Sequence, residues 1–266
     1  MTRSIAFGKA TNGFILISRV SALNNRRALT ATITQNSSLQ KQPTYTGLLV
    51  AIIVIACWAV SITLLMRWPV NFANPWLYVF VLLQTHLYTG LFITAHDAMH
   101  GSIAPKRWIN RAIGFISTFL YASFWYPKLY TKHHEHHNYV HTDKDPDYHH
   151  GSFLSWYVRF IRNYLSIWQI VVMAVIFNVL KIWISQANLL LFWVLPSLLS
   201  TLQLFYFGTY LPHRGEHDNR HQSRSLRRNH VLAFLSCYFF GYHYEHHDLP
   251  WLPWWKLWQA PEPPKR

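Results

Sequence analysis

Three clusters of histidine, each beside a long apolar run, constrain this chain more than any other feature of its sequence. On a helix, residues three and four positions apart lie on one face, so we expect each cluster to aim its ligands at one point. Imidazole binds zinc, copper, iron and nickel, and a single metal rarely takes more than four protein ligands. Eight clustered histidines therefore predict two metals. The histidines are His96 and His100; His133, His136 and His137; and His243, His246 and His247.

Four apolar segments approach or exceed the length that crosses a bilayer, which is roughly 20 residues of helix. The chain of 266 residues is 51% hydrophobic and only 13% charged, a composition that favours a membrane protein. We expect an all-α integral membrane protein with four membrane-spanning helices. The predicted spans are Tyr45–Met66, Pro75–Ala95, Tyr164–Ile184 and Asn188–Leu211.

Nearly all Lys and Arg residues lie in the segments on one side of the predicted spans. If the N-terminus is inside, every one of the 24 Lys and Arg residues except Arg67 and Lys181 falls in an inside segment. Positive residues mark the cytoplasmic side of a membrane protein. This orientation explains the net charge of +14 without a nucleic-acid partner. It places both termini and a histidine-rich cap that binds two metals on the cytoplasmic face.

Two further apolar segments are predicted to lie in the membrane interface or to re-enter it. Trp108–Tyr126 carries Arg111 and is followed by Pro127, and Val231–Tyr242 is too short to span. If Trp108–Tyr126 crossed, the second histidine cluster would lie on the opposite side from the first.

The simplest domain organisation is one catalytic domain with short extensions. It comprises a flexible basic arm at residues 1–44, the membrane domain at residues 45–258 and a tail at residues 259–266. The arm resembles a transit peptide as much as a segment that contacts anionic lipid. Cys57 and Cys237 lie in different apolar segments, and we expect two free thiols.

Two other metal enzymes fit the sequence poorly. The segment from His213 to His217, with Glu216 inside it, matches the inverted zinc-protease pattern over five residues only. A ferritin-like di-iron protein needs Glu-x-x-His motifs, and the chain contains none.

The histidine pattern resembles the membrane fatty-acid desaturase and hydroxylase superfamily, whose members hold two irons with histidine. Within it the chain looks most like the bacterial and cyanobacterial β-carotene ketolases, over roughly residues 45–258. The phrases that carry the likeness are His96-Asp97-Ala98-Met99-His100-Gly101; His133-His134-Glu135-His136-His137 followed by Asp143-Lys144-Asp145-Pro146-Asp147; Tyr210-Leu211-Pro212-His213-Arg214; and Tyr242-His243-Tyr244-Glu245-His246-His247.

The resemblance implies a ninth ligand at the end of the fourth span, which maps best to His213, with His217 one turn on as the competitor. His134 and His141 are interpreted as surface residues or as neighbours of the ligands. Carboxylates that accept from the second ring nitrogen of a ligating histidine fix its tautomer. Among four aspartates near the clusters, Asp97 and Asp143 are our candidates for this role; the alternative is that they are solvated loop residues.

For the chemistry, the resemblance implies two ferrous ions, dioxygen as co-substrate and two successive oxygenations at C4 of a β-carotene ring. The products would be echinenone and then canthaxanthin. No flavin, haem or iron–sulfur motif is visible in the sequence, so a separate reduced electron-transfer protein, with ferredoxin as the candidate, is implied. Aromatic side chains suit a conjugated substrate, and the candidates are Phe119, Trp125, Phe205, Phe207 and Phe240; the alternative is ordinary membrane packing.

Three other functions stay open. A carotenoid hydroxylase would stop after one oxygenation, and a fatty-acid desaturase or alkane hydroxylase would use the same ligands on another substrate. A metal transporter would need ionisable residues along its spans, and His86 is the only obvious one.

Overall fold

The computed structural model describes residues 44–226 and 229–261, and every regular element within these ranges is helical. This agrees with the predicted all-α class. Residues 1–43 of the predicted arm and residues 262–266 of the predicted tail lie outside the described residues, so the predicted domain boundaries stay a prediction.

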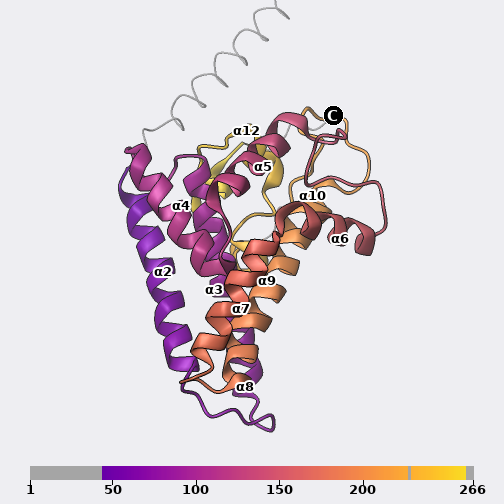
Figure 1. Ribbon diagram of the computed structural model, residues 1–266. Coiled ribbons are helices and arrows are strands. Elements are labelled where there is room, and N and C mark those ends of the chain that lie inside the picture. Colours follow the sequence, from indigo (N-terminus) through magenta and orange to yellow (C-terminus); the bar gives the residue numbers. More distant parts are fainter. Residues whose placement is uncertain (1–43, 227–228, 262–266) are drawn as a thin grey trace, which may run out of the picture. The chain divides into compact units, whose positions relative to one another are not determined.

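The helices fall into a bundle and a group of shorter elements at one end of it (Figure 1). The bundle contains α2 (Thr46–Leu65), α3 (Trp76–Met99), α4 (Arg107–Ala122), α7 (Ile167–Leu180), α8 (Gln186–Leu189), η1 (Leu190–Val194), α9 (Leu195–Leu204) and η2 (Phe205–Tyr210). The remaining elements are α5 (Tyr126–Tyr139), α6 (Phe153–Tyr164), α10 (Leu211–His213), α11 (His230–Cys237), α12 (His243–Asp248) and η3 (Trp254–Gln259).

Three helical stretches are long and apolar enough to cross a bilayer: α2, α3 and the stretch Gln186–His213. They correspond to the first, second and fourth predicted spans. The outer face of α2 carries large apolar side chains, including Leu49 and Leu64, which are 58% and 66% exposed. Such a surface is expected where lipid replaces water.

The third predicted span is shorter than expected. Its helix, α7, has 14 residues. It is long and apolar enough to span only when it is counted together with α6, from which it is bent by 82°. The chain must nevertheless return along the bundle here. His137 lies among the histidines at one end, whereas Asn188 lies at the far end of α2, where its Nδ2 donates to the carbonyls of Leu65 and Trp68, both at 2.7 Å. In Figure 1, α7 runs lengthwise along the bundle, and its Phe177 ring stacks on that of Trp193 in η1. A fourth crossing stays a prediction.

The last long helical stretch contains two π-helical turns, η1 and η2, which the sequence did not predict. Each precedes a proline, Pro196 or Pro212. A proline ring collides with the carbonyl four residues earlier, which belongs to Phe192 or Gly208, and both residues lie within the π turns. The wider turns therefore accommodate the prolines without ending the helix.

The segment between α3 and α5, predicted over Trp108–Tyr126 to lie in the interface or to re-enter it, forms one helix and then turns back, and its place relative to a membrane stays a prediction. Helix α4 has 16 residues, is not among the helices long enough to span, and ends at Ser123 in the left-handed region with φ of 53°. The chain then reverses into α5. The two helices approach closely because Gly114 has no side chain: a Cβ there would lie 2.2 Å from the ring of Tyr126.

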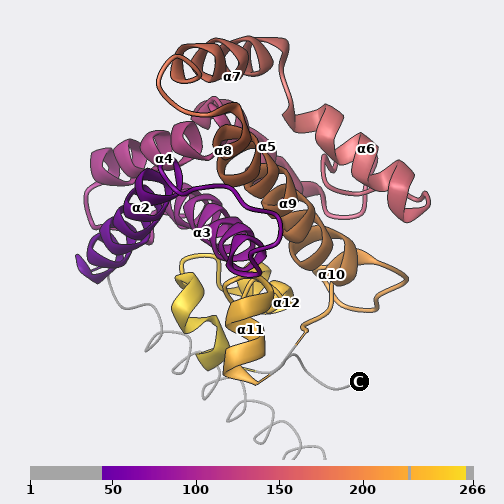
Figure 2. The same cartoon turned by 90° about the horizontal axis from the view of Figure 1, so that it is seen from below.

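The core lies between α3, α4 and α9, seen end-on in Figure 2, where α3 is central. Buried aromatic residues such as Tyr88 and Tyr121 fill it. Polar side chains also join the helices there: Thr89 Oγ1 donates to Gln203 Oε1 at 2.6 Å and lies 2.9 Å from Ser200 Oγ. Such bonds between helices stabilise membrane bundles. Cys57 and Cys237 are both free, as expected.

We predict that Gly114→Leu destabilises the protein, because the new side chain would displace Tyr126 from a packed site. Overpacking of this kind costs about 1–3 kcal/mol, which corresponds to a fall in Tm of roughly 2–10 °C. Thermal unfolding of the detergent-solubilised protein measures it. Ile116→Ala on the same helix is the control, since Ile116 is 47% exposed. An unchanged Tm for Gly114→Leu would contradict the close approach of α4 and α5.

Candidate metal centre

Nine histidines from four segments far apart in the sequence converge at one end of the bundle. Their ring nitrogens form two groups, within each of which the ligand atoms lie no more than 4.8 Å apart. One group contains His96, His100, His133, His137 and His246, and the other contains His136, His213, His243 and His247. All eight clustered histidines and the proposed ninth, His213, are therefore brought together, while His217 belongs to neither group.

The prediction that each cluster aims at one point is correct for the first cluster and wrong for the other two. In α5, His133 and His137 join the first group and His136 joins the second. In α12 the division is reversed, since His243 and His247 join the second group and His246 the first. The reason is helical geometry: residues i and i+4 lie nearly above one another, whereas i+3 is turned to the other side of residue i.

The nitrogens within each group lie at distances suited to a shared cation. In the second group, His247 Nε2 is 3.1 Å from His136 Nε2 and 3.0 Å from His243 Nε2, which in turn is 2.8 Å from His213 Nε2. Metal–nitrogen bonds of about 2.0–2.1 Å place neighbouring ligand nitrogens about 3 Å apart. In the first group, His246 Nε2 is 3.1 Å from His96 Nε2 and 2.9 Å from His137 Nε2.

The protonation states also suit metal binding. Burial, together with repulsion from neighbouring histidines, holds the pKa values of His133, His137, His246 and His247 well below the ordinary value. These pKa shifts favour the neutral rings, which is the form that ligates a metal. Each neutral ring has one nitrogen with a free lone pair that can bind a cation placed between the rings. The residues present thus fit a pair of metal ions.

His136 differs from these rings because it faces carboxylates. Burial lowers its pKa, but the charges of Asp147 and Asp145 outweigh this, so the pKa lies above its ordinary value. Burial raises the pKa of Asp147 to about 6, against the opposing effect of His136. A site that stabilises positive charge on His136 also stabilises a cation bound to it.

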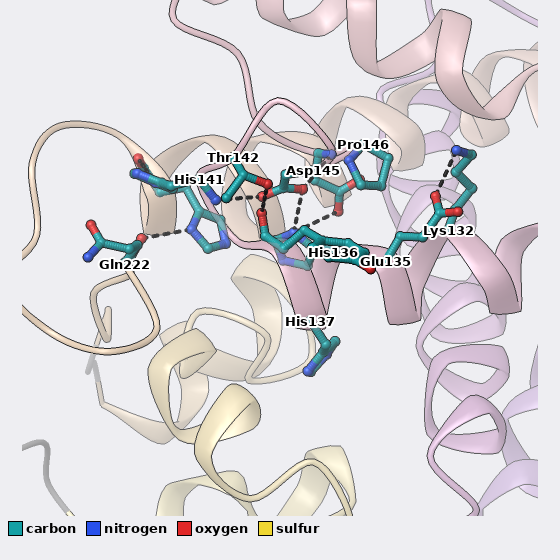
Figure 3. A network of polar contacts seen from close by, with 12 residues as sticks. Lys132, Glu135, His136, His137, His141, Thr142, Asp145, Pro146 and Gln222 are labelled. Carbon is teal, nitrogen blue, oxygen red and sulfur yellow. Dashed lines mark hydrogen bonds and ion pairs between the residues drawn. The ribbon is translucent and has the colours of Figure 1, made fainter.

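Asp145 holds His136 in position, and the sequence did not single it out (Figure 3). Its Oδ1 accepts from His136 Nδ1 at 2.9 Å, and its Oδ2 accepts from the backbone N–H of His141 at 3.0 Å. Asp145 is 1% exposed, whereas Asp143, our candidate for this role, is exposed. The acidic run alone gave no signal for choosing between them, because the turn that buries Asp145 depends on the tertiary structure.

Asp97 is buried beside the first cluster, but His96 Nδ1 forms no hydrogen bond with it, so its predicted role as an acceptor for His96 stays a prediction. Its Oδ1 lies 3.6 Å from His96 Nδ1, and its Oδ2 accepts from the backbone N–H of Trp254 at 3.2 Å. Asp97 therefore connects the end of α3 with η3, which lies more than 150 residues later in the chain.

Two of the other histidines, His134 and His141, lie beside the groups without joining them. His134 Nδ1 contacts the carbonyl of its own helix at Tyr130, and its ring stacks on that tyrosine. His141 Nε2 donates to the carbonyl of His213 at 3.0 Å, so it supports a residue of the second group. His213 itself donates from Nδ1 to the carbonyl of Gln222 at 2.9 Å.

An apolar cavity of about 530 Å³ adjoins both groups. His96, His133, His136 and His243 form part of its wall at one end. The wall continues along one helical stretch from Thr209 to Leu190, a distance of about 28 Å at 1.5 Å per residue. The cavity is therefore long, and one end meets the histidines.

One of the five predicted aromatic residues, Phe240, lines this cavity. Its ring centroid is 4.7 Å from that of His96, and it fits against η2 because a Cβ at Gly208 would lie 2.5 Å from it. The other four lie elsewhere. Phe119 and Trp125 are 54% and 67% exposed, Phe205 is buried against α6, and Phe207 borders a separate groove beside α3.

The family of the chain follows from comparison with known proteins. The fatty acid desaturase family matches residues 73–184 and 161–261, a region that contains all nine histidines. This chain belongs to the fatty acid desaturase family. The match confirms the resemblance seen in the sequence, and it identifies a membrane protein with a histidine metal site. No solved structure matches the chain.

Relatives within this family are carotenoid ketolases. The β-carotene ketolase of Paracoccus sp. strain N81106 / MBIC 01143 is 44% identical over 65% of this chain and 74% of its own length. The β-carotene ketolase of Paracoccus sp. strain PC1 is 41% identical over 77% of this chain and 87% of its own length. The zeaxanthin 4-ketolase of Chlamydomonas reinhardtii is 39% identical over 79% of this chain and 52% of the relative.

We predict that His136→Ala and His246→Ala each remove metal from one group and leave the other group loaded, because the two residues belong to different groups. Metal analysis of the purified membrane protein measures this. His134→Ala is the matched control, since His134 is next to a ligand on α5 but outside both groups. Full metal content in either variant would refute the assignment of that histidine.

We also predict that Asp145→Asn weakens metal binding by the second group about 10–100-fold, as is typical when a carboxylate that orients a ligating histidine is lost. Competition with a chelator gives the affinity. Asp143→Asn, two residues away and exposed, should leave it unchanged. Equal effects of the two substitutions would show that Asp145 does not orient His136.

Proposed function

We propose that this protein is a membrane di-iron oxygenase that introduces a keto group at C4 and C4′ of β-carotene rings. The observation that carries the proposal is the apolar cavity, which extends from the histidine groups to Leu190. A rod-like hydrocarbon with its ring at the histidines would fill such a cavity. The ketolase activity of the relatives supports the same substrate class.

The cavity is better suited to an uncharged hydrocarbon than to an acyl group with a charged carrier. Among the described residues, its wall contains no Lys or Arg. A carboxylate or phosphate along the cavity would therefore find no basic side chain to pair with, and its burial would be costly. This argues for a carotenoid over an activated fatty acid.

In the bound state, two ferrous ions held by the nine histidines supply the activation of dioxygen. Each of two rounds converts C–H to C–OH with one O₂, two electrons and two protons, and it releases one water. The resulting gem-diol loses a further water to give the ketone. The four electrons come from a reduced electron-transfer protein, for which ferredoxin is our candidate. We place the site and both termini on the cytoplasmic side, as the charge distribution predicts.

The chain itself positions the ring and excludes water. Phe240 and Met99 form apolar walls beside the histidines, and Met99 is 5% exposed. An apolar, water-poor site directs oxidation to the C–H bond held nearest the metals. Phe240 stands against His96, so it is suited to hold the ring at the first group.

The test is expression of the full chain in cells that make β-carotene, with pigment analysis by chromatography and mass spectrometry. We expect echinenone and canthaxanthin, and none from the His136→Ala variant. An alcohol as the sole product would indicate a carotenoid hydroxylase instead. Unchanged β-carotene from well-expressed protein with metal and reductant would refute the proposal and favour a lipid or alkane substrate.

A further inference from the structure

A tyrosine and an aspartate form a polar pair in the wall of the apolar cavity. The hydroxyl of Tyr164, the last residue of α6, donates to Asp147 Oδ1. Both side chains line the cavity, as do His136 and His243. Asp147 Oδ2 is 4.0 Å from His136 Nδ1, so the pair lies at the end of the cavity nearest the second group. Tyr164 also packs against the apolar cluster of Met99, Tyr126 and Leu129.

The surrounding structure fixes both members of the pair. Lys128 Nζ donates to the backbone carbonyl of Tyr164 at 2.9 Å, which holds the bend between α6 and α7 against α5. Asn163 Nδ2 donates to the carbonyl of Pro146 at 2.5 Å, and Trp156 Nε1 donates to that of Asp147 at 2.6 Å. The side chains of Asn163 and Trp156 thus join α6 to the segment of Asp147, and Lys128 joins it to α5.

The direction of the bond decides what the pair can recognise. A phenolic hydroxyl has one proton and can also accept. Because the proton of Tyr164 points to Asp147, its oxygen offers the cavity an acceptor only. A hydrocarbon ring has nothing to donate, and the pair remains satisfied without it. A ketone has no proton to donate either. An alcohol and a gem-diol both do.

We infer that Tyr164, held by Asp147, is a substrate-binding residue that retains the alcohol formed in the first oxygenation. The alcohol donates to Tyr164 Oη, so C4 stays at the metals for the second oxygenation. The finished ketone loses this bond and is released more readily. The inference rests on the proposed function, and it explains why such a site would produce ketones where a hydroxylase releases alcohols.

The test compares Tyr164→Phe with wild type in cells that make β-carotene. The variant keeps the ring and loses the hydroxyl, which is both the acceptor for the alcohol and the donor to Asp147. One neutral hydrogen bond corresponds to roughly a threefold to tenfold difference in retention. The ratio of C4 alcohol to ketone should therefore rise about threefold to tenfold. Tyr157→Phe is the matched control, since Tyr157 is on the same helix, packs against Phe205 and is not part of the cavity wall.

A binding measurement separates recognition from turnover. Purified, metal-loaded protein without reductant is titrated with a 4-hydroxylated β-carotene and with β-carotene itself. Tyr164→Phe should bind the alcohol about threefold to tenfold more weakly and β-carotene as well as wild type does. If wild type makes ketones, the inference alone is overturned by either of two results for Tyr164→Phe: it binds the alcohol as tightly as wild type, or it gives the same ratio of C4 alcohol to ketone. A wild type that makes no ketone would overturn the proposed function and the inference together.

Discussion

The convergence of nine imidazoles on two points is the constraint on which the rest of the structure depends. Their nitrogens lie 2.6–3.1 Å apart in six pairs. At this spacing the nitrogens of each group can share a cation, which would hold the rings together. Because the ligands come from α3, α5, α10 and α12, the ends of these four elements must meet. The reversal after α4, the return along α7 and the short α11 all deliver a histidine to that meeting point.

Much of this could be predicted from the sequence. The i, i+3, i+4 spacing identified eight of the nine histidines that converge, and the lengths of the apolar runs identified α2, α3 and the stretch that ends at His213. The division of the second and third clusters between two groups was missed because a spacing rule treats each helix alone. Which nitrogens share a metal depends on how α5 and α12 are turned toward each other.

The supporting residues were harder to predict for a related reason. Asp143 and Asp145 stand in the same acidic run, and only the fold of the loop buries Asp145 against His136. Phe119 and Trp125 lie in apolar segments near the clusters, but both are exposed and neither lines the cavity. The π turns of the last long helix follow from Pro196 and Pro212, yet the sequence does not say whether a proline kinks a helix or widens it.

The bend between α6 and α7 is a difference from the predicted spans that bears on function. A straight third span would satisfy its own backbone, whereas a break in an apolar region leaves carbonyls without partners. Lys128 meets this need by donating to the carbonyls of Tyr164 and Leu165, at 2.9 and 3.4 Å. The break directs α6 away from the bundle and lets α7 line the cavity. It also leaves Tyr164 at the corner, where its hydroxyl meets Asp147. The feature that shortens the predicted span is therefore the one that gives the cavity a polar end beside the histidines.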